Sequence, residues 1–312
     1  MDKTGLIWKF KVNRELTKLE KYDHMPVDKE STAKPASVVS TIRMNSTYLE
    51  WCDKFYFGRG EITAGGIYGF VLCIGMLSIP FVSILLEWPT RPDTDFSEWM
   101  WLLIGIWIIG IPTTLLVWFT WLNKEIFRYT HYPIRFNRKT RMVHFFRLDG
   151  TVMSESWDKL YATLGKGKEY GEREVLCHRL SEDGNTVLET HALPYVGFAG
   201  RPRSHWEFVR RYMEIGPAEV LPYIDHVLDG HIGQPGKREG FWHGYEMFST
   251  GWGAFIFYVF FPLTFCCVIG RWICMRTSKQ PVWPAEIEAE SAIDPDDPYL
   301  VDKDHLPEGV EA

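Results

Sequence analysis

The sequence predicts a membrane protein of the α+β class, in which a two-helix transmembrane hairpin is joined to a β-rich domain and a third apolar helical segment. The first observation is that the apolar residues of this 312-residue chain, 46% hydrophobic overall, are concentrated in uncharged stretches at 62–86, 99–123 and 247–270. Each is longer than the about 20 apolar residues that a helix needs to cross the hydrocarbon core. The second observation is that short segments rich in β-branched and aromatic residues follow one another between the second and third stretches.

The first two apolar stretches predict the hairpin, with spans at about 62–86 and 99–122 inside a region 61–123. Both are apolar on every face, and tryptophans lie near their ends, where the headgroup boundary favours an apolar ring with a polar N–H. Pro80 and Pro112 lie inside the spans, and lipid-embedded helices tolerate such kinks. The competing interpretation, a buried hairpin of a soluble protein, fits these lengths poorly.

Residues 1–60 are predicted to be a cytoplasmic N-terminal region with a linker at 29–41. Charges interrupt its first residues before a useful apolar run forms, so we expect no cleavable signal peptide, and the first span would act as its own insertion signal. The aromatic stretch 46–60 has a spacing that fits a helix lying flat at the membrane interface.

Charge predicts the orientation of the spans. Six cations follow the second span: Lys124, Arg128, Arg135, Arg138, Lys139 and Arg141. The loop between the spans holds only Arg91 against four acidic residues, and an excess of positive charge stays on the cytoplasmic side. We therefore expect the N-terminus and the soluble domain in the cytoplasm. The six cations, with Arg271 and Arg276, are the predicted contacts to anionic lipid headgroups, a more economical partner for them than nucleic acid because they lie beside the bilayer.

Residues 124–235 are predicted to form the cytoplasmic β-rich domain. Its six candidate strands are 132–137, 141–148, 150–157, 159–165, 174–180 and 185–193. Ser204 and Glu207 have the spacing of a capping box that opens a helix. A second apolar stripe of helical spacing, at 220–228, ends at Gly230.

The third apolar segment, 240–277, is predicted to be a membrane-associated helical segment broken at Pro262. A single crossing would place Arg271 and Arg276 outside, against the positive-inside rule. A re-entrant hairpin or an interfacial helix would keep both ends in the cytoplasm. A true third span stays open as the alternative, because the charge rule admits exceptions.

Residues 278–312 are predicted to be an acidic tail, since ten acidic residues face only one lysine among its prolines. A solvated tail is the simple interpretation. The alternative is an acidic docking strip for a basic partner protein or for the protein's own basic face. The residues proposed for that docking are Asp294, Asp296, Asp297 and Asp302.

No catalytic constellation is evident, so we expect neither an enzyme nor a cofactor. The densest cluster of possible metal ligands is Asp225, His226, Asp229 and His231. Because His231 follows Gly230, a polar helix end is favoured over a metal site. Cys177 and His178 are neighbours on a candidate strand and would point to opposite faces, which argues against a nucleophile–base pair. The spans lack the ionisable residues that mark transporters.

Two resemblances extend these predictions. The order of the candidate strands, opening with "IRFNRKTRMVHFF", resembles the pleckstrin-homology-like domains of bacterial membrane proteins, which implies a fold and no function. The stretches at 131–146 and 270–299 resemble an uncharacterised proteobacterial family of inner-membrane proteins with a domain of unknown function; with the paired spans, this resemblance covers 60–299. Members of that family are often encoded beside effectors of the type VI secretion system, a toxin injector.

What the second resemblance implies is a location in the bacterial inner membrane and a protein partner, either a toxin or a secretion component. The favoured hypothesis is an interaction protein, an immunity or accessory factor that binds its partner at the membrane. A membrane-active effector that inserts 247–275 into a target bilayer, and a membrane-anchored lipid- or protein-sensing module, are the alternatives. The sequence predicts no oligomeric state.

Overall fold

The computed structural model of the chain describes residues 4–37, 39–87, 96–166, 173–194, 202–228, 232, 236–251, 258–307 and 310. The fold is α+β, as predicted, and it divides into two compact units. Unit 1 contains Met1–Gly58, Tyr129–Lys237 and Gln280–Ala312, and unit 2 contains Arg59–Arg128 and Arg238–Lys279. Each unit is therefore built from segments that are distant in the sequence.

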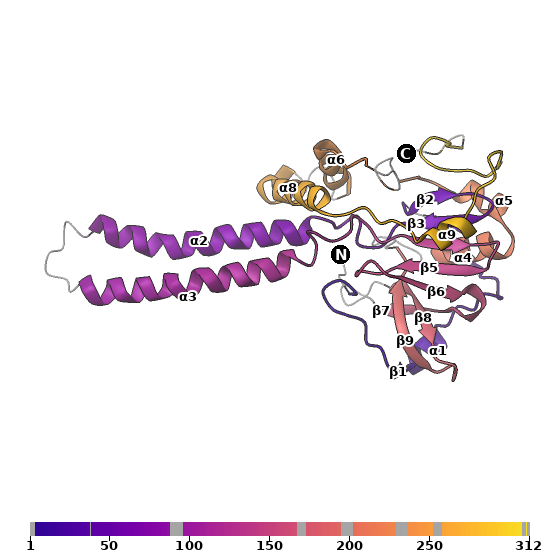
Figure 1. Ribbon diagram of the computed structural model, residues 1–312, viewed down its shortest axis with the longest axis horizontal. Coiled ribbons are helices and arrows are strands. Elements are labelled where there is room, and N and C mark those ends of the chain that lie inside the picture. The colour runs from indigo at the N-terminus through magenta and orange to yellow at the C-terminus, as the bar shows by residue number, and fades with distance from the viewer. Residues whose placement is uncertain are drawn as a thin grey trace. The chain divides into compact units, whose positions relative to one another are not determined.

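Unit 1 contains an antiparallel sheet with the strand order β2-β3-β4-β5-β6 (Figure 1). Its strands are β2 (Thr41–Met44), β3 (Tyr48–Trp51), β4 (Ile134–Asn137), β5 (Met142–Phe146) and β6 (Val152–Ser156). Strand β3 pairs directly with β4, with Tyr48 opposite Asn137 and Trp51 opposite Ile134, although the first part of unit 2 separates them in the chain.

The second antiparallel sheet of unit 1 has the order β1-β9-β8-β7. Its strands are β1 (Arg14–Glu15), β7 (Tyr161–Lys166), β8 (Arg173–Leu180) and β9 (Thr186–Ala192). The helical elements of unit 1 are α1 (Lys18–Tyr22), η2 (Trp157–Lys159), α4 (Pro202–Glu214), α5 (Pro217–Val220), η3 (Leu221–Tyr223) and α9 (Ala285–Glu290). Each of the six candidate strands between 132 and 193 overlaps one strand of these two sheets.

One core is shared by the sheets and α4. Trp51, Trp157, Trp206, Phe136 and Phe208 are all buried there, and the rings of Trp157 and Trp206 stack with 5.2 Å between their centroids. Burial of such large apolar rings supplies the main driving force for folding of this unit.

Three local predictions in unit 1 are wrong. The stretch 46–60 is not an interfacial helix, because Tyr48–Trp51 is the buried strand β3. Helix α4 begins at Pro202, before the expected capping box, and the Glu207 carboxylate instead accepts hydrogen bonds from Arg210. The apolar stripe 220–228 is helical only at its start, and it is extended by Leu228, whose N–H donates to the Thr41 carbonyl at 2.8 Å.

The C-terminal segment also differs from the prediction of a solvated tail. Val301 is buried in the core of unit 1, and its backbone exchanges two hydrogen bonds with Met44 of β2, at 2.8 and 2.9 Å. Trp283 and Ile287 are buried as well. Between its acidic residues, this segment carries apolar side chains that are buried, so the segment is part of the fold.

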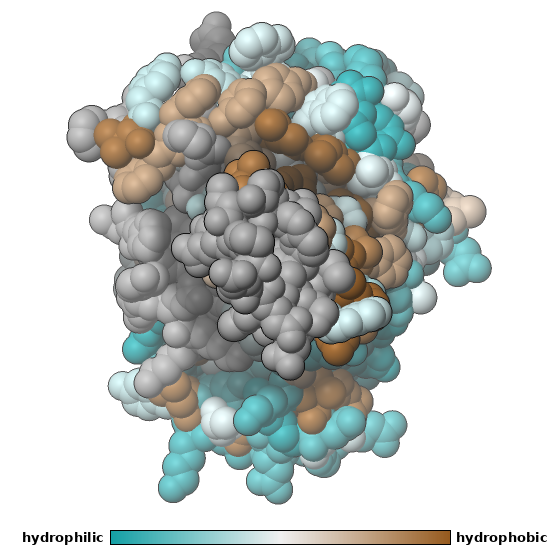
Figure 2. All heavy atoms as spheres, turned by 90° about the vertical axis from the view of Figure 1, so that its left-hand side faces the viewer, coloured by the Kyte–Doolittle hydropathy of each residue, from teal (hydrophilic) through white to brown (hydrophobic). Residues whose placement is uncertain are grey.

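Unit 2 is helical, with α2 (Glu61–Glu87), α3 (Phe96–Leu122), α6 (Phe241–Gly251) and α8 (Phe261–Thr277). Figure 1 shows α2 and α3 side by side, with α6 and α8 beside the N-terminal end of α2. Pro262, where a break was expected, lies in the first turn of α8. Figure 2 shows hydrophobic atoms, in brown and tan, gathered at the height of α6 and α8.

Among the described residues, one helical stretch, Glu61–Ser83 of α2, is long and apolar enough to cross a membrane, with a mean hydropathy of 1.9. The described apolar part of α3, Trp107–Leu122, is shorter, and Pro112 lies inside that helix.

Candidate functional site

The six cations that follow the second apolar stretch are divided between the two units. Lys124 and Arg128 belong to unit 2 and are exposed. The other four, Arg135, Arg138, Lys139 and Arg141, belong to unit 1. The sequence predicted these six cations as one group, but the fold divides them between unit 1 and unit 2.

The exposed cations of unit 2 lie where two segments meet. The Lys279 N–H donates to the Arg128 carbonyl at 2.7 Å, and the Ser278 hydroxyl donates to the Glu125 carbonyl at 3.3 Å. Arg276 is also exposed, and its guanidinium lies 5.8 Å from the ring centre of Trp272. Exposed cations beside a tryptophan are typical of a membrane boundary.

Arg271, in contrast, is fully buried. Its guanidinium forms a two-point ion pair with the Glu239 carboxylate, with Nε–Oε1 at 2.5 Å and Nη2–Oε2 at 2.9 Å. The structure thus places Arg271 in an internal ion pair of unit 2 instead of at a surface. The sequence offered a weak signal for it, since Glu239 precedes the same apolar segment.

Glu125 organises the N-terminus of α2. Its carboxylate accepts hydrogen bonds from the Gly60 and Thr63 N–H groups, at 2.7 and 2.8 Å, and from the Thr63 hydroxyl at 2.6 Å. A carboxylate at this position satisfies N–H groups that the helix leaves free and complements the helix dipole. No role for Glu125 was predicted from the sequence.

A second buried arginine organises unit 1. The Arg135 guanidinium lies between the rings of Tyr48 and Trp283, 4.4 and 4.8 Å from their centres, and pairs with Glu50 at 2.7 Å and Glu288 at 3.2 Å. Desolvation of an arginine is costly, and the two carboxylates and two rings offset that cost. Arg135 is therefore a structural link between β4, β3 and the C-terminal segment.

The other three of the six cations that lie in unit 1 are less buried than Arg135. Arg138 donates to the Ile215 carbonyl at 3.2 Å, and Arg141 pairs with Asp158 at 2.5 Å and Glu214 at 2.9 Å. Lys139 is exposed.

The four candidate docking aspartates include two that are paired within the protein and two that are exposed. Asp297 accepts hydrogen bonds from the N–H and the hydroxyl of Ser46, both at 2.8 Å, and Asp302 lies 3.6 Å from the Arg43 guanidinium. Asp294 and Asp296 are exposed. Two of the four therefore bind the protein itself, and two face solvent.

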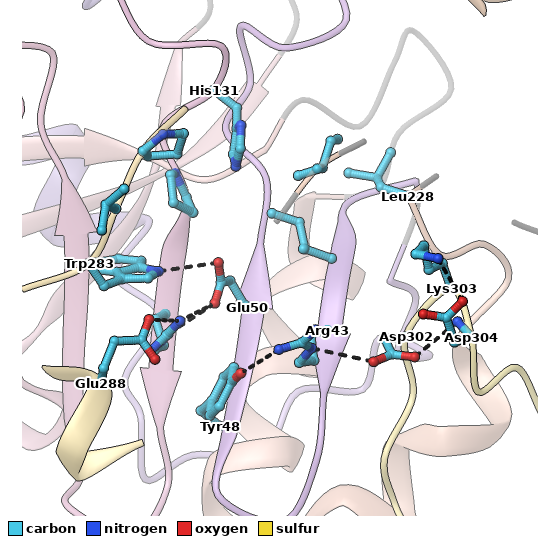
Figure 3. A pocket seen from close by; sticks show the side chains of 16 residues that line it. Arg43, Tyr48, Glu50, His131, Leu228, Trp283, Glu288, Asp302, Lys303 and Asp304 are labelled. Atoms are coloured by element: carbon cyan, nitrogen blue, oxygen red, sulfur yellow. Dashed lines mark hydrogen bonds and ion pairs between the residues drawn. The ribbon is translucent and has the colours of Figure 1, made fainter. Parts of the chain in front are cut away.

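Unit 1 has a groove of about 180 Å³, lined by Arg135 and Asp302 but not by Asp294, Asp296 or Asp297 (Figure 3). Strands β2, β3 and β4 contribute Arg43, Tyr48, Glu50 and Arg135, and the C-terminal segment contributes Trp283, Glu288, Asp302 and Lys303. In Figure 3, Trp283 and Glu288 lie on one side of Glu50, with Arg43 and Asp302 on the other. Nη1 of Arg135 is buried and has no hydrogen-bond partner among the described residues. The groove offers both charges and an aromatic wall, which suits a polar segment of another molecule.

A larger cavity of unit 1, about 430 Å³, lies elsewhere. Its aromatic walls are Phe10, Phe55, Phe145 and Phe146. Three of its polar groups are paired with each other, since Arg147 and His191 both bind Glu189, at 2.6 and 2.8 Å.

The histidine and cysteine candidates form no reactive group in the described residues. Asp229 and His231 lie outside those residues, and no cluster of three or more metal-ligating side chains occurs within them. Cys177 is in the core, where burial raises the pKa of its thiol, and His178 donates to or accepts from the Thr190 hydroxyl at 2.8 Å. The two side chains do not form a pair.

Comparison with known proteins gives one match. Residues 111–295 match a family described as a family of unknown function (DUF6708). No curated protein and no solved structure matches the chain.

Proposed function

The chain belongs to the DUF6708 family, whose function is unknown, and from this premise we propose that it is a membrane-anchored binding protein: unit 2 holds it in a bilayer and unit 1 binds a partner protein. The membrane part of the proposal depends on one observation, the exposure of apolar side chains along α2 and α3.

Val71, Met76, Ile79 and Leu86 of α2 are between 62 and 73% exposed, and Ile108, Ile109 and Leu116 of α3 are between 64 and 70% exposed. The two helices contact each other through Phe70 and Trp118, with 5.1 Å between ring centres, and through Phe81 and Trp107, with 5.8 Å. Soluble proteins rarely expose apolar surface of this extent, whereas lipid covers it without cost. A core helix of a soluble protein would have these side chains buried.

The proposal includes a two-span hairpin. Helices α2 and α3 each have 27 residues, about 40 Å at 1.5 Å per residue, against a hydrocarbon core of about 30 Å. The exposed cations Lys124, Arg128 and Arg276 then contact anionic headgroups on the cytoplasmic side, which places unit 1 in the cytoplasm. The proposal does not assign that role to Arg135 and Arg271, which are buried in ion pairs.

The proposed partner binds unit 1 through the groove and the exposed acids Asp294 and Asp296, so it presents basic residues. The resemblance to an inner-membrane family encoded beside type VI effectors narrows the proposal to a bacterial toxin or a secretion component. In that role the protein is an immunity or accessory factor at the inner membrane.

Two experiments test the proposal. Full-length protein in its native membranes is first extracted with alkaline carbonate; we expect it to stay in the pellet, and release into the supernatant would contradict the anchor. The tagged protein is then purified in mild detergent, with Asp294→Asn/Asp296→Asn as the variant and Asp149→Asn, an exposed acid between β5 and β6, as its control. A stoichiometric protein that the double variant loses and the control keeps supports binding through this surface. Purification of the protein with lipid alone would contradict it, and toxicity on expression would favour a membrane-active effector.

A further inference from the structure

We infer that α6 and α8 form a helical pair that lies in one leaflet of the bilayer and returns the chain to the side from which it came, with the lipid surface as its partner. This rests on the proposed membrane anchor. This return of the chain decides which side of the membrane holds the C-terminal segment.

The first step is topological. Unit 1 contains three stretches of chain, and unit 2 is inserted between them as two excursions, Arg59–Arg128 and Arg238–Lys279. The three stretches share one fold, since β3 pairs with β4 and Met44 pairs with Val301. A folded unit cannot have pieces on both sides of a bilayer. Each excursion must therefore begin and end on the same side, which requires an even number of crossings.

The second step is a matter of length. Helices α6 and α8 have 11 and 17 residues, which correspond to about 17 and 26 Å at 1.5 Å per residue. Neither reaches the about 30 Å of the hydrocarbon core. The first excursion has two helices that are long enough for two crossings. In the described part of the second excursion no helix is that long, and α6 and α8 pack against each other, with Phe248 in one cluster with Cys267 and Val268. The second excursion therefore turns back without a complete crossing.

The third step is the depth of the helical pair. Gly270 packs so closely on α2 that a Cβ there would lie 2.5 Å from the Gly60 carbonyl oxygen and 2.8 Å from the Ala64 nitrogen. Cys274 packs against Leu122, the last residue of α3. These contacts occur where α2 begins and α3 ends, which is the level of a membrane boundary.

The exposed side chains of this helical pair are of the kinds found at a membrane boundary. Among its described residues, the exposed large hydrophobic ones are Trp242, Tyr258, Val259, Phe260, Phe261 and Trp272, from 42 to 72% exposed. Tryptophan and tyrosine prefer the headgroup boundary, and Arg276 and Lys279 follow at the C-terminal end of α8. The Glu239–Arg271 pair neutralises the only charged residue inside α8 before its last turn, which lowers the cost of burying it in a helix that lies in lipid. This apolar surface continues that of α2 and α3, so lipid is the occupant that covers both.

The experiment uses full-length protein in intact cells and a membrane-impermeant maleimide. Three single substitutions add a cysteine: Lys18→Cys in the N-terminal stretch, Asp93→Cys between the two long helices, and Asp304→Cys in the C-terminal segment. We expect Asp93→Cys to react in intact cells, and both Lys18→Cys and Asp304→Cys to react only after permeabilisation. Different behaviour of Lys18→Cys and Asp304→Cys would overturn the inference. Carbonate extraction of the same cells separates this outcome from failure of the anchor, because a protein without an anchor would leave the membrane.

Depth is measured with nitroxide labels at Val259→Cys and Met76→Cys in reconstituted vesicles. We expect the Val259 label to be more accessible to oxygen than to a water-soluble nickel complex, and shallower than the Met76 label in the middle of α2. A Val259 label as deep as the Met76 label, or one in water, would overturn a position within one leaflet.

Discussion

Arg271 and Glu239 form a buried ion pair of unit 2, with the arginine side chain fully inaccessible and the glutamate side chain 5% exposed. The arginine comes from α8, and the glutamate lies two residues before the first residue of α6. The pair therefore fastens the two helices to each other.

Removal of one partner should destabilise unit 2 strongly. Glu239→Gln leaves Arg271 buried without its counter-charge, and we expect a loss of about 3–5 kcal/mol in unfolding free energy. The double variant Glu239→Leu/Arg271→Leu should recover most of this loss, because apolar residues of similar volume replace both charges. Thermal unfolding in detergent measures both. Equal losses in the single and double variants would show that the pair acts through packing rather than charge.

The close approach of α8 to α2 predicts a sensitive glycine. Gly270→Ala should cost about 1–3 kcal/mol, since the added methyl group meets backbone atoms that cannot move aside. Gly69→Ala in α2 is the matched control: no atom lies within 4 Å of its Cβ, and alanine favours a helix by up to about 1 kcal/mol. Thermal unfolding in detergent compares them, and equal stability of the two variants would contradict this contact.

The C-terminal segment should behave as part of unit 1. Trp283→Ala removes a ring that covers Arg135 and should cost about 3–5 kcal/mol. Asp296→Asn, an exposed residue of the same segment, should change stability by less than about 0.5 kcal/mol. Denaturant unfolding of the full-length protein is the measurement. A Trp283→Ala variant as stable as Asp296→Asn would restore the interpretation of a solvated tail.

Acid should destabilise unit 1 through three buried histidines. Burial, together with the Arg135 charge, lowers the pKa of His144 to about 4, and burial lowers the pKa of His178 to about 4 and that of His205 to about 3. Because these pKa values lie below the unfolded value of about 6.5, the unfolded chain binds more protons. Their contribution is complete above about pH 6.5 and is lost as the pH falls toward 4, by up to about 1.4 kcal/mol per pH unit for each histidine.

Denaturant unfolding at a series of pH values measures this slope. His144→Asn, in which the amide nitrogen can replace Nδ1 beside Ser154, should reduce the slope by about a third. An unfolding free energy that does not change between about pH 7 and pH 5 would contradict the buried neutral state of these rings.

The strands from 132 to 193 could be predicted because each has its own alternating pattern and a turn at each end. Strand β3 could not, because the aromatic residues from Tyr48 to Tyr56 fit a helix as well as a strand, and the deciding partner, β4, follows only after unit 2. The pairing of Val301 with Met44 was hidden for the same reason. Local composition indicated a charged tail. Only the pairing of Val301 with Met44 of β2 shows why that segment also contains apolar residues.

The candidate site, too, could be predicted only in part from the sequence. Charge patterning identified Arg135 and Arg271 as cations next to apolar stretches, but it contains no information on which carboxylate each one meets. By itself, the sequence determined the apolar stretches, their charge asymmetry and the strand-rich middle region, because these depend on residues close together in the chain. Tertiary structure alone decided which arginines are buried and which stretches share a unit, because ion pairs and sheet edges join residues that the sequence separates.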